Sequence, residues 1–193
     1  MFRIIFILSI AFLMACKGGH PADYEVQVEL QLIDTLKGKI ETVRGWMEKM
    51  PLNEIQERLD VINNNSDYII HQLREQGLQA DEQMSKTMDD YKAFKKLYSV
   101  CADSFKPIVT EAEELFYQLK TLKESAYTKD YQKDTFLMYF HKEKADVEQL
   151  YQLASSILKP AVDTDLDFER TEAEVEAIAQ ELKENSGALK EEE

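Results

Sequence analysis

The sequence contains few of the residues that interrupt helices or cross-link a chain. Its 193 residues include 6 glycines, 4 prolines and 2 cysteines. So few glycines and prolines leave long segments free to form helices, and two cysteines cannot build the disulfide framework of a small secreted domain. The longest apolar run, residues 4–14, is shorter than the roughly 20 residues that a membrane-spanning helix needs.

Basic residues are also scarce. The chain has 23 Lys and Arg against 37 Asp and Glu, which gives a net charge of −14. A protein of this charge would be repelled by the phosphates of nucleic acid, so we expect no nucleic-acid partner. No segment alternates apolar and polar residues over a strand's length, so we expect no sheet.

The first 15 residues follow the order of a secretory signal. Arg3 supplies a positive charge, and the apolar run over residues 4–14 comes next. This length is typical of the apolar region of a signal peptide, which spans about 7–15 residues. A small residue, Ala15, then precedes Cys16. The alternatives are an ordinary signal peptide followed by a chance cysteine, or a buried apolar segment.

The segment Leu13-Met14-Ala15-Cys16 resembles the lipobox of bacterial lipoproteins. The resemblance implies a signal peptide of residues 1–15, acylation of Cys16 (palmitate among the acyl chains) and attachment to a membrane of the cell envelope through the lipid. Lys17 after the cysteine resembles outer-membrane sorting. Whether the protein faces the periplasm or the cell surface stays open.

On this interpretation, the sequence divides into four parts. Residues 1–15 are the signal peptide, 16–21 a short tether, 22–186 a helical bundle domain and 187–193 an acidic tail. The tether beyond Cys16 reaches at most about 18 Å, since an extended residue spans about 3.3–3.6 Å. Processing removes one basic residue and no acid, so 22 basic and 37 acidic residues remain, a charge of −15.

Apolar residues recur at alternating steps of three and four through most of the domain, the spacing of helices that bury one face. We expect helices that end before Pro51, at Gly77, before Pro160 and at Gly187. Between the helix that ends at Gly77 and the one that ends before Pro160, one long helix should cover about residues 81–126, since the apolar spacing continues through Pro107.

These segments predict an all-α fold, an elongated antiparallel up-and-down bundle of four to five helices. The long helix would measure nearly 70 Å at about 1.5 Å per residue and would overhang shorter partners. One elongated domain is the favoured arrangement. The alternative is two three-helix bundles that share the long helix, with a subdivision near Pro107.

One group of acids has the spacing of a calcium-binding loop. Asp163, Asp165, Asp167 and Glu174 occupy positions one, three, five and twelve. Position six, where the loop needs glycine, is Phe168. We therefore favour helix capping by residues 163–165, and a capping box at residues 171–174, over a weak calcium site.

Other metal, cofactor and catalytic signals are absent or isolated. The histidines, His20, His71 and His141, lack the Glu-x-x-His spacing of a di-metal bundle, and the methionines fit core positions, so we expect no metal and no cofactor. Cys101 lies on an apolar stripe and is interpreted as a core thiol. No nucleophile, phosphate-binding or zinc-protease motif occurs, so we expect no catalysis.

The predicted function is an interaction or scaffold domain, with an envelope protein or a second copy as partner. The motivation is aromatic surface beside the main stripe, at Phe116, Tyr117, Tyr127, Tyr131 and Tyr139. A five-helix core could equally use these residues internally. The alternative function is a small-ligand- or metal-binding bundle with an aromatic-lined pocket between helices.

Overall fold

The computed structural model describes residues 26–128 and 130–191, with side chains described through residue 185. The described chain forms five helices: α1 (Gln27–Lys49), α2 (Leu52–Glu75), α3 (Glu82–Thr128), α4 (Lys133–Asp163) and α5 (Asp165–Glu191). This confirms the predicted all-α helical bundle. The predicted signal peptide, Cys16 and the tether lie outside the described residues.

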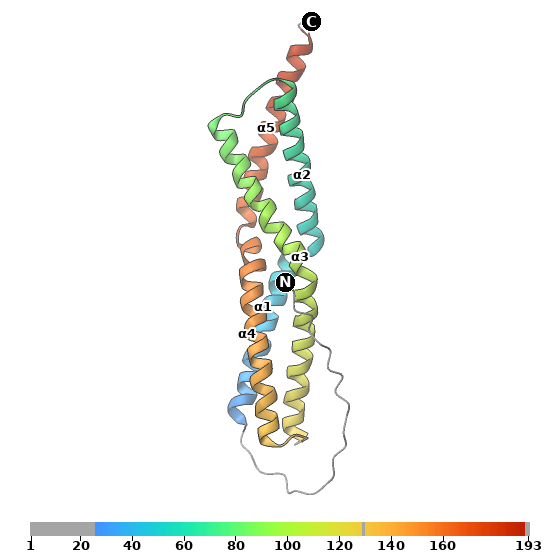
Figure 1. Cartoon of the computed structure of the whole chain (residues 1–193), viewed down its shortest axis with the longest axis vertical. Helices are drawn as coiled ribbons and strands as arrows, with labels where there is room; N and C mark the ends of the chain where they lie inside the picture. Colours follow the sequence, from blue (N-terminus) through green and yellow to red (C-terminus); the bar gives the residue numbers. More distant parts are fainter. Residues whose placement is uncertain (1–25, 129, 192–193) are drawn as a thin grey trace.

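The helices form a rod made of three arms that lie side by side, and each arm runs along the length of the rod (Figure 1). Helices α1 and α2 run end to end as the first arm, α3 returns along the whole rod, and α4 and α5 form the third arm. With 47 residues, α3 is about 70 Å long. Stacking the shorter helices in pairs covers its whole length, so the predicted overhang does not arise.

Each half of the rod has its own core. Helices α1 and α4 pack with the second half of α3, and α2 and α5 pack with the first half of α3. We call these halves the α1/α4 bundle and the α2/α5 bundle. Phe105 and Ile157 contact both cores and make them continuous. The rod thus combines the predicted elongated bundle with its alternative, two three-helix bundles that share one helix.

Three prolines lie where the two bundles meet. Pro51 separates α1 from α2, Pro107 lies inside α3, and Pro160 lies in the last turn of α4. On each arm, the buried residues change from one core to the other within about two turns of the proline. Because proline has no backbone N–H, all three arms lack a donor at this joint.

The helix end at Gly77 and the stop at Pro51 are confirmed. Gly77 has a φ of 63°, which glycine adopts without steric cost. Its N–H donates to the carbonyl of Arg74 (3.2 Å), and the N–H of Leu78 donates to that of Leu73 (2.9 Å). This pair of hydrogen bonds is the Schellman motif, and it satisfies carbonyls that a helix end leaves unpaired.

Two other predicted helix ends are wrong. Helix α4 continues past Pro160 to Asp163, because the Pro160 carbonyl still accepts a hydrogen bond from the N–H of Thr164 (3.0 Å). Helix α5 passes through Gly187 to Glu191, since a single glycine inside a helix costs only about 1 kcal/mol. The predicted continuity of the long helix through Pro107 is confirmed, and Figure 1 shows α3 changing direction near its middle.

Candidate functional site

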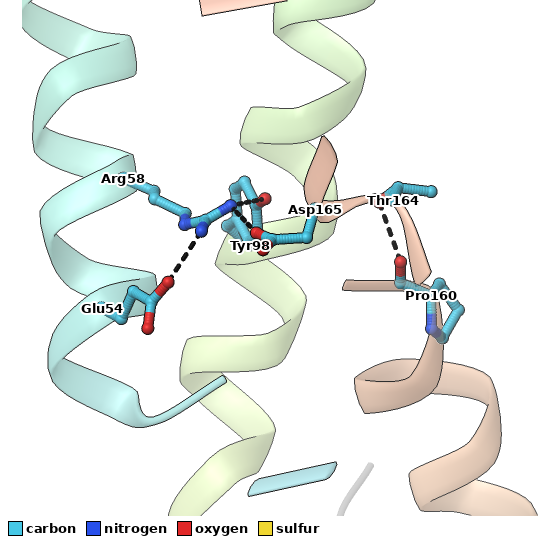
Figure 2. A network of polar contacts seen from close by, with 6 residues as sticks. All are labelled: Glu54, Arg58, Tyr98, Pro160, Thr164 and Asp165. Atoms are coloured by element: carbon cyan, nitrogen blue, oxygen red, sulfur yellow. Dashed lines mark hydrogen bonds and ion pairs between the residues drawn. The ribbon is translucent and has the colours of Figure 1, made fainter. Parts of the chain in front are cut away.

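The most connected polar group of the described residues is Arg58, one and a half turns into α2. Figure 2 shows its guanidinium between two carboxylates and a phenol from three helices. Nη2 donates to Glu54 Oε1 (2.7 Å), Nη1 donates to the Tyr98 hydroxyl (2.9 Å), and Nη1 also forms an ion pair with Asp165. Arg58 therefore ties together the beginning of α2, the first half of α3 and the first residue of α5, all beside the proline joint.

Aromatic rings surround the same guanidinium. Its carbon lies 4.9 Å from the centroid of the Phe168 ring and 5.6 Å from that of Tyr98, within cation–π range. Phe168 is buried and also meets Phe94 and Tyr98 edge-on, with centroids 5.5 and 5.3 Å apart. The side chain of Arg58 is only 11% exposed, so its contacts are largely shielded from water.

The ionisation of this site favours a structural role. Burial opposes the charge on Arg58, but its hydrogen bonds to Tyr98, Glu54 and Asp165 outweigh that effect and raise its pKa further above its already high value. Burial raises the pKa of Tyr98 to about 12, although Arg58 opposes the shift. At neutral pH the Arg58 guanidinium therefore keeps its charge and the Tyr98 phenol stays neutral, so their contact is a hydrogen bond from a fixed positive charge.

The junction between α4 and α5 is held by backbone contacts at Thr164. Its hydroxyl donates to the Pro160 carbonyl (2.8 Å), beside the hydrogen bond from its own N–H (Figure 2). The Thr164 carbonyl then accepts the N–H of Phe168 (2.9 Å), the first helical bond of α5. Thr164 thus ends α4 and begins α5, so the two helices of the third arm follow each other with almost no loop.

The four acids with calcium-loop spacing do not form a common site. Asp163 pairs with Lys159, Asp165 with Arg58, Asp167 with Arg170, and the Glu174 carboxylate accepts from the Thr87 hydroxyl. Residues 165–191 form the continuous helix α5, so no twelve-residue loop exists between Asp163 and Glu174. In the described part of the chain, no group of three or more His, Cys, Asp or Glu is arranged to hold a metal ion.

The capping interpretation of this segment is confirmed in position but not in its side-chain hydrogen bonds. Thr164 directly precedes α5, and Asp165 and Asp167 lie in the first turn of that helix, where acids complement the helix dipole. Asp163 and Asp165 are engaged by Lys159 and Arg58, and the Thr164 hydroxyl points back to α4. The predicted capping box fails because Thr171 lies inside α5, where its hydroxyl donates to the Asp167 carbonyl (2.9 Å). The physical reason is that α5 starts directly from α4 and not from a loop.

Cys101 is a buried free thiol, as predicted. Its Sγ donates to the Ile157 carbonyl (3.1 Å), and burial raises its pKa to about 11. A thiol held neutral in this way is a poor nucleophile. His71 and His141 are exposed, and His20 lies outside the described residues.

The aromatic residues predicted as a docking flank mostly serve the fold. Phe116 packs against the core of the α1/α4 bundle, with Lys37 and Arg44 each 4.5 Å from its ring centroid. Tyr131 and Tyr139 also pack there and contact each other, with centroids 5.4 Å apart. Of the five, only Tyr117 and Tyr127 are exposed. The internal use of these rings, left open by the sequence, therefore applies to three of them.

The surface of the described chain includes two open hollows. One runs along α3 beside Pro107, and all its lining residues belong to that helix. The other lies between α3 and α5 and is lined by polar and charged side chains, among them Thr87, Arg170 and Glu174. Neither has the aromatic lining that the ligand-binding alternative predicted.

Glu143 is the one acidic side chain among the buried residues of the described core. It occupies a core position of α4, its Oε1 lies 3.2 Å from Lys142 Nζ, and its Oε2 is buried without a hydrogen-bond partner. Burial raises its pKa above the ordinary value, Lys142 opposes the shift and Asp146 adds to it. The charged form of Glu143 therefore opposes folding.

Comparison with known protein families, curated proteins and solved structures gives no match to this chain. Within the described residues, none of the helices combines the length and apolar character needed to span a bilayer.

Replacing Arg58 by alanine should lower the free energy of unfolding by about 2–3 kcal/mol, because it leaves two carboxylates and a phenol without their partner. For a domain of this size, thermal denaturation followed by circular dichroism should show the midpoint falling by roughly 4–12 °C. Arg170→Ala is the matched control, since Arg170 also pairs with an acid but is 71% exposed. An equal shift for both variants would contradict the role given to Arg58.

Replacing Glu143 by glutamine should stabilise the protein at pH 7 by about 1 kcal/mol, or roughly 2–4 °C. The folded state raises the pKa of the Glu143 carboxyl. The charged carboxylate therefore lowers the stability of the fold at pH values above this raised pKa, and this effect disappears as the pH falls below the ordinary pKa of glutamate. The gain should therefore vanish in melts near pH 4. Glu113→Gln removes the same charge from an exposed position and should change little at either pH; a pH-independent gain for Glu143→Gln would refute the argument.

Proposed function

We propose that the chain is a cell-envelope lipoprotein whose mature part is a non-catalytic helical rod that serves as a scaffold for an envelope partner. The observation that carries this proposal is the order of the N-terminal residues: Arg3, the apolar run over 4–14, then Ala15 and Cys16. Cleavage before Cys16 and acylation of its thiol would anchor the rod, since stable anchoring takes more than one acyl chain.

The position of α1 supports this arrangement. The first described residue, Val26, directly precedes α1 and lies ten residues after Cys16. Ten extended residues reach at most about 36 Å, so a lipid on Cys16 would keep one end of the rod near the bilayer. This reach is longer than the limit of about 18 Å for the predicted tether, because that tether ends at residue 21 and α1 is preceded by Val26.

The contacts made by the buried polar groups support a scaffold role over an enzymatic role. Arg58 joins three helices, the Cys101 thiol bonds to the backbone of α4, and Thr87 of α3 donates to Glu174 of α5. Each contact holds helices together and leaves the side chain unavailable for chemistry on a substrate. An elongated rod held in this way offers a long surface to a partner.

The ligand- or metal-binding alternative gains no support from the described residues. It predicted aromatic side chains around a pocket between helices, whereas Tyr91, Phe94 and Tyr98 pack on Phe168 and the guanidinium of Arg58. Native mass spectrometry of the protein purified from its host tests this alternative directly.

Replacing Cys16 by serine should abolish acylation, because a hydroxyl cannot take the thiol's place in lipid attachment. We expect the wild-type chain, expressed in a bacterium with labelled palmitate, to carry label and float with the membrane fraction. The Cys16→Ser variant should carry no label. Mass spectrometry of the wild-type N-terminal peptide should give a chain that begins at an acylated Cys16.

Cys101→Ser is the matched control and should keep both the label and the membrane fraction, since Cys101 is buried. Label that persists in Cys16→Ser, or a mature chain that begins elsewhere, would overturn the lipoprotein proposal. In the same cells, a photo-crosslinking residue at exposed Tyr117 should give a discrete crosslinked product. Its absence at every exposed position of α3 would count against the scaffold role.

A further inference from the structure

One tip of the rod exposes apolar side chains on all three of its helices. This tip, where α1 begins, α3 ends and α4 begins, carries Val28, Tyr127 and Met138, which are 64%, 68% and 59% exposed. Each lies within about two turns of its helix end. Each also lies two residues from a buried position of its own helix and so projects outward. We call these three side chains the apolar collar.

Charge is distributed unevenly between the two halves of the rod. With α3 divided at Pro107, the α1/α4 bundle carries 13 acidic and 10 basic residues, whereas the α2/α5 bundle carries 18 acidic and 10 basic. Most of the excess negative charge lies on the half of the rod far from the apolar collar. An anionic bilayer surface would therefore repel the α2/α5 bundle more strongly than the α1/α4 bundle.

The chain before α1 joins the rod at the same tip. Val26 precedes the first turn of α1, and Cys16 lies ten residues before it. Resting on the proposed lipid anchor, we propose that this tip docks on the bilayer, with Tyr127 and Met138 in the headgroup region and the acidic α2/α5 bundle pointing away.

The chemistry of the collar fits a lipid surface. Tyrosine is enriched at membrane–water interfaces, where its ring lies in apolar surroundings and its hydroxyl stays hydrated. Methionine and valine would add apolar contact with the acyl boundary, and the smaller negative charge of the α1/α4 bundle lowers the barrier to approach. Contact between the tip and the bilayer would thus give the lipid-anchored rod a preferred orientation.

Fluorophores attached to introduced cysteines test this orientation. The variants Tyr127→Cys and Met138→Cys place a probe in the collar, and Leu78→Cys places one after α2, at the opposite tip. Full-length lipidated protein is reconstituted in phosphatidylcholine–phosphatidylglycerol vesicles, some containing a lipid with a quencher near its headgroup. The wild-type chain is the background control, because Cys101 is buried and Cys16 is acylated in the proposed protein.

We expect the quencher lipid to reduce fluorescence at positions 127 and 138 several-fold more than at position 78. Protein that floats with the vesicles but shows no quenching in the collar overturns tip docking while leaving the lipid anchor intact. Equal quenching at all three positions means that the rod lies flat, and it overturns the orientation. Protein that does not float with vesicles at all overturns the anchor and, with it, this inference. Quenching in the collar that disappears on dilution of the protein points to contact between copies and also overturns it.

Discussion

The structure depends on one constraint, the loss of a backbone donor at the same level in all three arms of the rod. Pro51 ends the first helix, Pro160 lies in the last turn of α4, and Pro107 interrupts the hydrogen bonding of α3 without ending it. The two cores meet at this level, and α3 alone continues across it. Arg58 lies beside the joint and ties the helices together there, because it binds groups on α2, α3 and α5.

The sequence predicted the helices well and their pairing less well. Spacing of three and four identifies a buried face within one helix, so the long helix through Pro107 followed directly. The same spacing carries no information on which helices are neighbours, and the stacking of α1 on α2 depends on contacts with α3. Helix ends were predictable where a positive φ requires glycine, as at Gly77, and not where a proline falls in a last turn, as at Pro160.

The site was largely invisible in the sequence, for a physical reason. The pair Glu54 and Arg58 has the i, i+4 spacing of a helical ion pair and could have been found. Its partner Asp165 comes from the other end of the chain, and only the fold brings it close. The acids around Asp165 instead resembled a calcium loop. Phe168, the residue that broke that pattern, is the buried ring on which the aromatic cluster packs. The residue that departs from the calcium-loop motif is thus a residue of the core.

The central claim is that α3 is one helix shared by both bundles, and the distance between spin labels on either side of Pro107 tests it most directly. Labels on the variants Val100→Cys and Tyr127→Cys are both at exposed positions of α3. At about 1.5 Å per residue, a continuous helix separates their backbones by roughly 40 Å. Electron–electron double resonance should give one narrow distribution near that value. A broad distribution, or a clearly shorter distance, would mean that the chain breaks at Pro107 and would contradict the shared-helix rod.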